Sequence, residues 1–455
     1  MALSTIILAA GQGTRMRSDL PKVLQLLAGR PLLAHVLDCA ATLAADDVCV
    51  VYGHGAEAVR SEFESNSLRW ALQAEQLGTG HAIQQAMPDT PDENRVLVLF
   101  GDVPLLTPAT CQRLIDETPY GDMAVLTVDM DDPTGYGRII RERGNVSCIV
   151  EEKDAGPEEK AVREINTGVM VCPADKLKGW LDNLGNDNAQ GEYYLTDAIA
   201  MAVNDGITVH GIKADSSIEV MGINDKKQLA EAERALQARL VDELMKDGVG
   251  FADPARVDIR GTLKCGNDVF IDINAVFEGD VELGDGVKIE SNNLLRDTKL
   301  GAGTVLHSNC HLEGASTGQD CEIGPFARMR PGAELANNVK VGNFVEIKKS
   351  TVADGSKVNH LTYIGDTEIG KKVNVGAGTI TCNYDGANKY KTTIGDGAFI
   401  GSGVELVAPV KVGAGATIGA GSTITKNVED DQLALERARQ KVVPGWNKPV
   451  KKGAD

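Results

Sequence analysis

Short apolar runs alternate with amphipathic stretches along the first half of the chain. Thr5–Ala9, Val48–Tyr52 and Val96–Phe100 are almost wholly apolar, and a helical stretch, Pro31–Leu43, lies between the first two. Continuous apolar strands separated by helices are typical of a mostly parallel sheet that is covered on both faces. We therefore predict a Rossmann-like α/β domain over residues 1–224.

One long amphipathic stretch follows this domain. Its leucines fall on one helical face: Leu229, Leu236, Leu240 and Leu244. Gly248 supplies a stop signal. We predict a linker helix over residues 225–248.

Aliphatic residues then recur every six positions. The residues in step are Ile323, Met329, Leu335, Val341 and Ile347, then Ile369 and Val375, then Ile394, Ile400, Leu406, Val412 and Ile418. A hexapeptide period predicts a parallel β-helix, in which each aliphatic side chain points inward and small residues fit the tight corners. We assign this domain to residues 249–436 and a C-terminal tail to residues 437–455.

The six-residue phase breaks twice, between Ile347 and Ile369 and between Val375 and Ile394. The first break holds Asn359–Tyr363 and the second holds Thr381–Asn388. Interruptions of a solenoid are commonly loops on one binding face. We expect both polar segments to be extruded loops.

Composition narrows the functional class. The formal net charge of −19 disfavours sequence-independent nucleic-acid binding. No apolar run reaches the roughly 18 residues of a membrane-spanning helix, and no basic leader precedes the first strand, so we expect a cytoplasmic protein without a membrane partner. None of the nine cysteines forms a C-x-x-C pair, so we expect reduced thiols.

A glycine-rich turn follows the first strand, in the segment Gly11–Met16, with Pro21-Lys22 shortly after it. Parallel sheets bind ligands beyond the carboxyl ends of their strands, which is where this turn lies. Glycine lets backbone N–H groups approach a phosphate, and Arg15 and Lys22 can neutralise phosphate charge. The turn lacks the third glycine of the dinucleotide fingerprint and the G-K-[ST] of a Walker loop.

The longer string L-x-x-G-x-G-T-R-M-x4-P-K resembles the sugar-1-phosphate nucleotidyltransferases. Further matching segments are Gln73–Gly80, Phe100–Leu105, Gly135–Arg138, Val150-Glu151, Glu164–Gly168 and Gly222–Asn224. With the hexapeptide repeat, the resemblance covers essentially the whole chain. It is close to the bacterial bifunctional enzymes that combine N-acetylglucosamine-1-phosphate uridyltransferase and glucosamine-1-phosphate acetyltransferase activities.

For the first half, the resemblance implies transfer of UMP from UTP to N-acetylglucosamine 1-phosphate, with Mg²⁺ held by Asp102 and Asn224. The implied nucleotide and sugar residues are Leu8, Ala9, Ala10, Gly11, Arg15, Lys22, Gln73, Gly78, Thr79, Phe100, Gly101, Asp102, Gly137, Glu151, Asn166 and Asn224. Phe100 departs from the family, which often has tyrosine there, so a hydroxyl contact would be missing. Structural alternatives are that Asp102 caps a turn and that Asn224 caps the linker helix.

For the second half, the resemblance implies a left-handed, trimeric β-helix that transfers the acetyl group of acetyl-CoA. His360, in H-L-T-Y, would be the general base, because histidine titrates near neutrality. The implied sugar-phosphate and amino-sugar residues are Arg330, Lys348, Tyr363 and Asn374. The implied acetyl-CoA residues are Ala377, Asn383, Tyr384, Ser402, Ala420 and Arg437, with Lys389 a weaker candidate for the coenzyme phosphates.

The leading hypothesis is a two-reaction enzyme of UDP-N-acetylglucosamine synthesis for cell-envelope precursors. One alternative is a nucleotidyltransferase whose β-helix is only structural. Another is a non-enzymatic nucleotide-sugar sensor or scaffold. His360 within a phase break argues against the first alternative, and the combination of Lys22, Asp102 and Asn224 argues against the second.

Overall fold

The computed structural model describes residues 2–449 and 451, except 54 and 64–66. The end of the predicted tail, residues 450 and 452–455, therefore lies outside the described residues. The chain divides into two compact units, Met1–Gln237 and Ala238–Asp455, within the long helix α8 (Lys226–Lys246). This helix is the predicted amphipathic stretch. It ends before Gly248, which has a φ of 96°.

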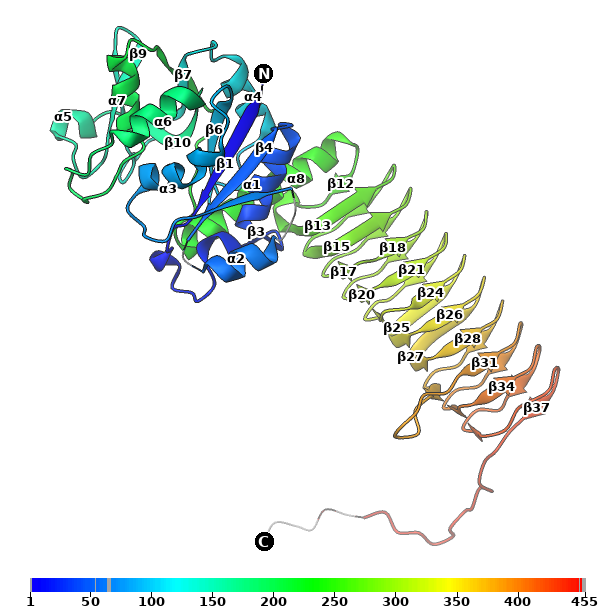
Figure 1. Cartoon of the computed structure of the whole chain (residues 1–455). Helices are drawn as coiled ribbons and strands as arrows, with labels where there is room; N and C mark the ends of the chain where they lie inside the picture. The colour runs from blue at the N-terminus through cyan, green and yellow to red at the C-terminus, as the bar shows by residue number, and fades with distance from the viewer. Residues whose placement is uncertain (1, 54, 64–66, 450, 452–455) are drawn as a thin grey trace. The chain divides into compact units, whose positions relative to one another are not determined.

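A mixed sheet forms the centre of the first unit (Figure 1). Its strands run in the order β11 (Val209–Lys213), β7 (Met123–Asp129), β10 (Glu164–Pro173), β6 (Arg95–Phe100), β1 (Leu3–Ala9), β4 (Asp47–Tyr52) and β5 (Arg69–Leu72). A hairpin of β8 (Arg138–Glu142) and β9 (Asn145–Val150) joins it through β10. On the main path β10 is antiparallel to both neighbours, and the other adjacent pairs are parallel. The predicted mostly parallel sheet is thus confirmed.

Helices cover both faces of this sheet. Consecutive residues of β1, such as Ile6 and Ile7, are fully buried in two different hydrophobic clusters, one on each face. One cluster includes side chains of α3 (Thr79–Ala86), α6 (Ala174–Asp182) and α7 (Asp197–Asn204), and the other includes side chains of α1 (Leu32–Thr42), α2 (Ala56–Glu62) and α4 (Pro108–Asp116). A short α5 (Pro157–Lys160) completes the helices of this unit. Burial on both faces explains the continuous apolar strands.

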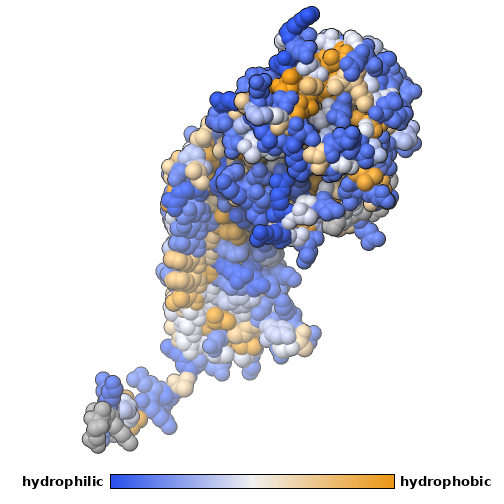
Figure 2. All heavy atoms as spheres, turned by 90° about the vertical axis from the view of Figure 1, so that its left-hand side faces the viewer, coloured by the Kyte–Doolittle hydropathy of each residue, from blue (hydrophilic) through white to orange (hydrophobic). Residues whose placement is uncertain are grey.

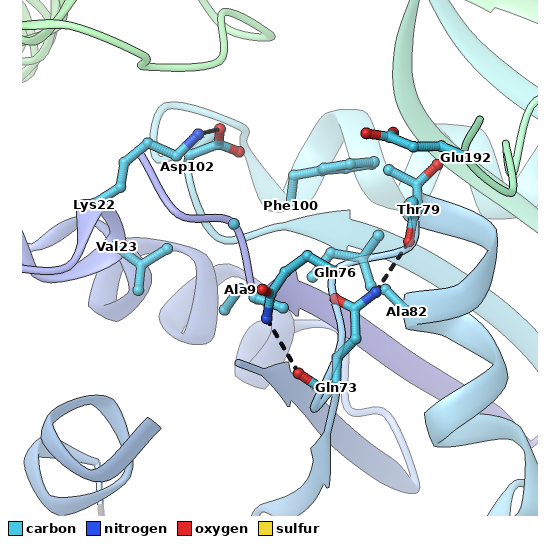
Figure 3. Close-up of a pocket in the computed structure, with 14 residues that line it drawn as sticks. Ala9, Lys22, Val23, Gln73, Gln76, Thr79, Ala82, Phe100, Asp102 and Glu192 are labelled. Atoms are coloured by element: carbon cyan, nitrogen blue, oxygen red, sulfur yellow. Dashed lines mark hydrogen bonds and ion pairs between the residues drawn. The ribbon is translucent and has the colours of Figure 1, made fainter. Parts of the chain in front are cut away.

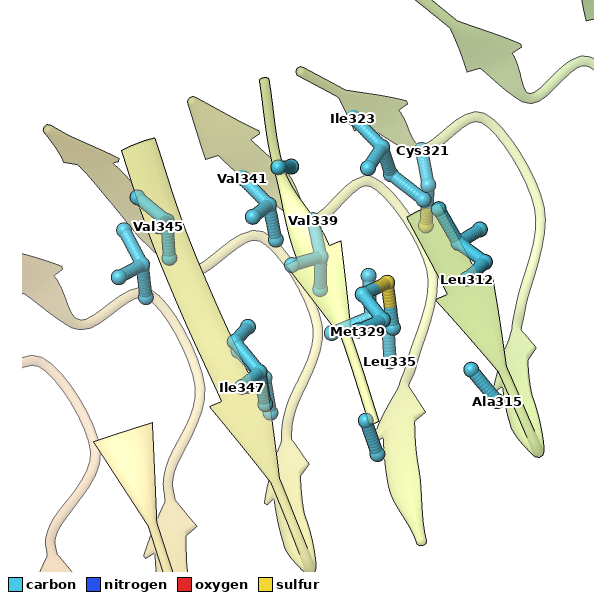
Figure 4. Close-up of a cluster of buried hydrophobic side chains, with 14 of the residues drawn as sticks. Leu312, Ala315, Cys321, Ile323, Met329, Leu335, Val339, Val341, Val345 and Ile347 are labelled. Atoms are coloured by element: carbon cyan, nitrogen blue, oxygen red, sulfur yellow. The ribbon is translucent and has the colours of Figure 1, made fainter. Parts of the chain in front are cut away.

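The second unit is a stack of parallel coils from β12 (Gly250–Phe251) to β37 (Leu433–Ala434) (Figure 1). Strands pair in parallel with strands one coil later, as in the pair β25 (Lys340–Lys348) and β27 (Lys357–Gly365). The residues predicted to point inward are buried, and their aliphatic side chains stack from coil to coil (Figure 4). The hexapeptide prediction of a parallel β-helix is confirmed.

The backbone is left-handed at the same corner of successive coils. Residues with φ between 48° and 76° follow one another there: Asn274, Asn292, Asn309, Phe326, Phe344, Leu361, Gly378, Gly403 and Gly421. Asparagine and glycine adopt this conformation easily, whereas bulky residues rarely do. Phe326, Phe344 and Leu361 nevertheless occupy it, and they are 49%, 55% and 62% exposed. We call these three residues the corner ridge; the two phenyl rings are stacked with centroids 5.2 Å apart.

The first phase break is not an extruded loop, so that prediction was wrong. The inward positions Ile347, Val352, Val358, Ile364 and Ile369 are all buried, and two sides of the coil are simply one residue shorter than the others. His360 consequently lies within β27, paired with β25. The second break is a loop, since the segment from Thr381 to Ile394 is far longer than one side of a coil. It projects between β30 (Ile380–Cys382) and β31 (Thr392–Ile394).

Two candidate active sites

A pocket of about 230 Å³ opens at the carboxyl ends of β1 and β6 (Figure 3). The predicted residues that line it are Leu8, Ala9, Ala10, Gly11, Lys22, Gln73, Gly78, Thr79, Phe100 and Asp102. Four more lining residues were not predicted: Val23, Gln76, Ala82 and Glu192. Gln76 lies within the matching segment Gln73–Gly80 but was not singled out, whereas Val23, Ala82 and Glu192 stand outside the matching segments and reach the pocket through the fold.

Three polar side chains meet beside this pocket. Lys22 Nζ donates to Asp102 Oδ2 at 2.5 Å and to Asn224 Oδ1 at 3.2 Å. Asp102 comes from the end of β6 and Asn224 from just before α8, so the fold joins positions that are far apart along the chain. Two oxygens that converge on one ammonium form a donor set of the kind that Mg²⁺ prefers.

Helix capping does not explain Asn224, so that structural alternative was wrong. Asp225 Oδ1 accepts the backbone N–H of Gln228 at 2.8 Å and thereby caps α8. The Asn224 amide instead contacts Lys22 and donates to Gly222 O at 3.2 Å. The Asn224 side-chain oxygen therefore faces the Lys22 ammonium rather than the helix end.

The predicted sugar residues Gly137, Glu151 and Asn166 also come together. Asn166 N–H donates to Gly137 O at 2.8 Å, and a Cβ added to Gly137 would lie 3.4 Å from the Glu151 carboxyl. The Thr196 hydroxyl donates to Glu151 Oε1 at 3.1 Å. Burial raises the pKa of Glu151 above the usual carboxyl range. These residues are not part of the pocket lining described above.

Phe100 forms an apolar wall next to this cluster. A Cβ on Gly168, which has a φ of 86°, would lie 2.5 Å from the phenyl ring, so the ring lies directly against that glycine. Gly168 N–H in turn donates to Asn166 Oδ1 at 2.9 Å. Of the remaining predicted residues, Gly101 is buried behind the pocket and Arg15 is exposed on the turn after β1.

Basic side chains gather on the β-helix. Arg330 forms an ion pair with Glu346 at 2.8 Å. The neighbouring ammonium of Lys389 lowers the pKa of Lys348, and Arg330 adds to this effect. Lys389 belongs to the extruded loop and lies beside Lys348, which favours a shared anion site.

Tyr363 and Asn383 meet over Gly365. A Cβ on Gly365 would lie 2.4 Å from Tyr363 Oη and 2.8 Å from Asn383 Nδ2. Tyr384 is exposed on the adjacent loop, where its hydroxyl donates to Gly386 O. Asn374 precedes the positive-φ corner at Gly378, on a different side of the coil from Tyr363, so one chain does not bring these two predicted residues together.

His360 has a partner that the sequence analysis missed. Its Nδ1 lies 2.9 Å from Asn343 Oδ1, and the two residues are paired one coil apart on β27 and β25. Because a carbonyl oxygen can only accept, Nδ1 carries the proton and Nε2 carries the lone pair. The recurrence of equivalent positions from one coil to the next was the signal that could have identified Asn343.

Small residues continue this column in the coils that follow His360. Ala377, Ser402 and Ala420 occupy equivalent positions in three successive coils. At about 4.8 Å per coil, the column from His360 to Ala420 spans roughly 14 Å. Arg437 lies at its far end, with Cδ 3.9 Å from a Cβ added to Gly421. Ala377, Ser402 and Ala420 thus form a track of small side chains with the Arg437 cation at one end.

Comparisons with known proteins cover both units. The profile of the MobA-like NTP transferase domain matches residues 5–150, and that of the bacterial transferase hexapeptide matches residues 263–297 and 391–426. The bifunctional protein GlmU of Aromatoleum aromaticum is 56% identical over 99% of this chain and 100% of its own length. That of Herminiimonas arsenicoxydans is 54% identical over 99% of both chains. A solved structure of a putative glucose-1-phosphate thymidylyltransferase from Bacillus anthracis is 19% identical over 52% of this chain and 95% of its own, with a TM-score of 0.43.

Two further observations concern the chain as a whole. All nine cysteines are free thiols. Among the residues that the structure describes, no helix combines the length and the apolar character needed to cross a membrane.

Proposed function

The chain belongs to the GlmU family of bifunctional proteins, and from this membership we propose which residues carry each of its two reactions. The protein is a nucleotidyltransferase and an acetyltransferase of UDP-N-acetylglucosamine synthesis. We assign uridylyl transfer to residues 1–224, acetyl transfer to residues 249–436, and connecting roles to residues 225–248 and 437–455. The positions matched by the two family profiles support this division.

In the first unit, the pocket beyond β1 and β6 holds UTP. The turn after β1 and Gln73 bind the nucleoside, while Lys22 and Arg15 neutralise the phosphates. A phosphate oxygen of N-acetylglucosamine 1-phosphate attacks the α-phosphorus, and pyrophosphate leaves. No protein base is required because the attacking group is already an anion, so catalysis depends on positioning and electrostatics.

Asp102 and Asn224 would hold Mg²⁺. Their convergence on the Lys22 ammonium supports this assignment, since the two side chains already present oxygens to one cation. A bound Mg²⁺ would neutralise charge on the triphosphate. Lys22 would then leave Asp102 and contact a phosphate instead.

Glu151, Asn166 and the backbone of Gly137 bind the sugar. Carboxylate and amide groups suit the hydroxyls of a pyranose, and the Phe100 ring offers an apolar surface beside them. Since phenylalanine has no hydroxyl, its role is packing against Gly168 and the ligand rather than hydrogen bonding.

In the second unit, His360 acts as the general base. Asn343 keeps the Nδ1 proton in place, so Nε2 accepts the proton of the amino group of glucosamine 1-phosphate as the nitrogen attacks the thioester carbon. The carbon–sulfur bond of acetyl-CoA then breaks, and the leaving sulfur takes the proton that His360 had accepted, so that CoA leaves as a thiol and the histidine is neutral again. Arg330, Lys348 and Lys389 bind the sugar phosphate.

The track of Ala377, Ser402 and Ala420 accommodates the pantetheine arm, with Asn383 and Tyr384 beside it. Small side chains let an extended arm approach the coil backbone closely. Arg437 binds coenzyme phosphate. Tyr363 and Asn374 bind the amino sugar, and we infer that residues of a second copy complete the site because the two lie on different faces of one chain.

We propose a cytoplasmic homotrimer. The corner ridge supports self-association, because three large apolar side chains are exposed in consecutive coils next to His360. On the face seen in Figure 2, apolar residues form a row along the coils between polar ones. Nine free thiols agree with a reducing compartment.

The convergence of Lys22, Asp102 and Asn224 carries the uridylyl assignment most directly. A nucleoside-triphosphate panel with N-acetylglucosamine 1-phosphate tests it through pyrophosphate release. Release with UTP that requires Mg²⁺ and fails in Asp102→Ala supports the assignment. Undiminished release from the Asp102→Ala variant contradicts it.

A further inference from the structure

The Gln73 side chain is held from two directions in the wall of the nucleotide pocket. Its Nε2 donates to Gly78 O at 3.1 Å and lies 3.1 Å from His81 Nδ1. The residue is only 3% exposed. Its backbone is fixed as well, because its N–H donates to Tyr52 O at 2.8 Å and its carbonyl accepts from Gln76 Nε2 at 3.3 Å. The amide is therefore a rigid group rather than a side chain that can adapt to any ligand.

The chemistry of the two neighbours determines which way this amide faces. Gly78 O can only accept a hydrogen bond, so the amide nitrogen must face it. The second N–H then points to His81 Nδ1, which has to present a lone pair and leave the ring proton on Nε2. Both donor hydrogens are thus used inside the protein.

The oxygen of the same amide is left for the pocket. Among the described residues, no partner donates a hydrogen bond to Gln73 Oε1, and Figure 3 shows this oxygen turned away from the bond to Gly78. An acceptor in a mostly buried wall requires a donor from the ligand, because an unpaired polar group there is unfavourable.

We propose that His81 is a positioning residue that makes Gln73 present a carbonyl oxygen to the base, and that this selects a base with an N–H donor on the facing edge. The proposal rests on the proposed function, which places the base beside Gln73. Uracil carries a hydrogen on N3 and can donate to Oε1. Cytosine carries a lone pair on N3, so it would leave the Gln73 oxygen unpaired and face it with another acceptor.

His81 matters because, with its ring proton on Nε2, it adds a second acceptor that opposes turning the amide over. With His81 present, a rotated amide places its oxygen against two acceptors, Gly78 O and His81 Nδ1. Without the imidazole only Gly78 O opposes the rotation, so the amide nitrogen can face the pocket more often and pair with cytosine. The loss of His81 should therefore change base selection more than it changes nucleotide binding in general.

The test compares His81→Phe with His81→Asn in the full chain. Phenylalanine keeps a ring but removes the acceptor, whereas the Asn side-chain oxygen can stand in for Nδ1. We expect His81→Phe to lower the ratio of kcat/KM for UTP to that for CTP roughly 10-fold, and His81→Asn to restore most of it. Gln85→Met is the matched control: Gln85 lies on the same helix, and its only side-chain hydrogen bond within the described part of the chain is to the helix backbone at His81 O, so the ratio should not change.

Several results separate failure of this inference from failure of the site assignment. If His81→Phe lowers kcat/KM equally for UTP and CTP, His81 is merely structural and the proposal is overturned. If Gln73→Leu also leaves UTP turnover unchanged, the base does not bind beside Gln73 and the proposed site itself is wrong. Should His81→Phe fail to fold, 3-methyl-UTP tests the unmodified protein: blocking N3 should reduce kcat/KM at least 10-fold, and an undiminished value contradicts a role for the Gln73 oxygen.

Discussion

Lys22 occupies the position at which Asp102 and Asn224 would hold Mg²⁺, so removing its charge should have opposite effects on metal binding and catalysis. The ammonium is largely buried, with 13% of the Lys22 side chain and 17% of the Asp102 side chain exposed. A cation that binds the two oxygens has to displace it. The substitution Lys22→Met removes this competitor while it keeps an apolar side chain of similar length.

The magnitude follows from the contact that is lost. Hydrogen bonds to charged groups contribute about 1.5–3 kcal/mol, and each 1.4 kcal/mol is about a factor of ten. Without nucleotide, Lys22→Met should therefore bind Mg²⁺ about 10- to 100-fold more tightly than the unmodified protein. Uridylyl transfer should fall by roughly 10²–10³, because a cation that stabilises the phosphates is lost.

Titration calorimetry with Mg²⁺ alone measures the first effect, and pyrophosphate release measures the second. Lys178→Met serves as the control, since Lys178 forms an ion pair with Asp92 elsewhere in the same unit and should change neither value. If Lys22→Met binds Mg²⁺ no more tightly than the unmodified protein, the two oxygens do not form the metal site.

Three further predictions concern other parts of the molecule. Asn343→Ala should lower kcat for acetyl transfer roughly 10- to 100-fold, since partners that orient a functional histidine have effects of that size. The pH profile of acetyl transfer should also shift, because His360 loses the partner that fixes its tautomer. An unchanged kcat and an unchanged pH profile would show that the contact is incidental. Phe344→Glu should convert the proposed trimer to smaller species in light scattering, whereas Phe270→Glu, a change of an equally apolar exposed residue off the corner ridge, should not. If the Phe344→Glu variant is still a trimer, the corner ridge is not the interface. Glu151→Gln should raise the thermal unfolding midpoint at pH 8, because the folded state raises the pKa of this carboxyl by burial and is penalised when it ionises. The gain should vanish as the pH falls to about 4, and a constant gain would refute this reasoning.

The hydrophobic pattern predicted the architecture because both units bury side chains with a simple period. In the first unit, β6 is apolar from Val96 to Phe100 because the sheet is covered on both faces. In the second unit, buried residues such as Met329 recur every six positions because every side of a coil buries one aliphatic group. The antiparallel direction of β10 left no comparable mark, since its buried run Val169–Cys172 has the same apolar pattern in either direction.

The wrong prediction for the first phase break has a geometric reason. The interval between Ile347 and Ile369 fits an inserted loop and also fits four sides of which two are one residue short. Each of the two short sides keeps its inward residues buried and has one left-handed residue at its corner, Lys349 and Asp366, with φ of 44° and 48°. Counting residues along the chain does not distinguish the two cases.

The candidate sites were predictable where a motif marks them and not where the fold assembles them. The Gly-rich turn, Asp102 and His360 stand in recognisable strings. Glu192 and His81 are brought to the nucleotide pocket or its wall by neighbouring segments without a motif of their own. The amide of Asn343 meets His360 only because the β-helix stacks the two positions in successive coils.

The independence of the two sites is tested most directly by measuring both reactions on each of two variants, Asp102→Ala and His360→Ala. Pyrophosphate release reports uridylyl transfer, and free thiol released from acetyl-CoA reports acetyl transfer. We predict that Asp102→Ala loses only the first activity and His360→Ala only the second, each by at least about 10²-fold. Loss of both activities in either variant, or of neither, would contradict two separate sites on one chain.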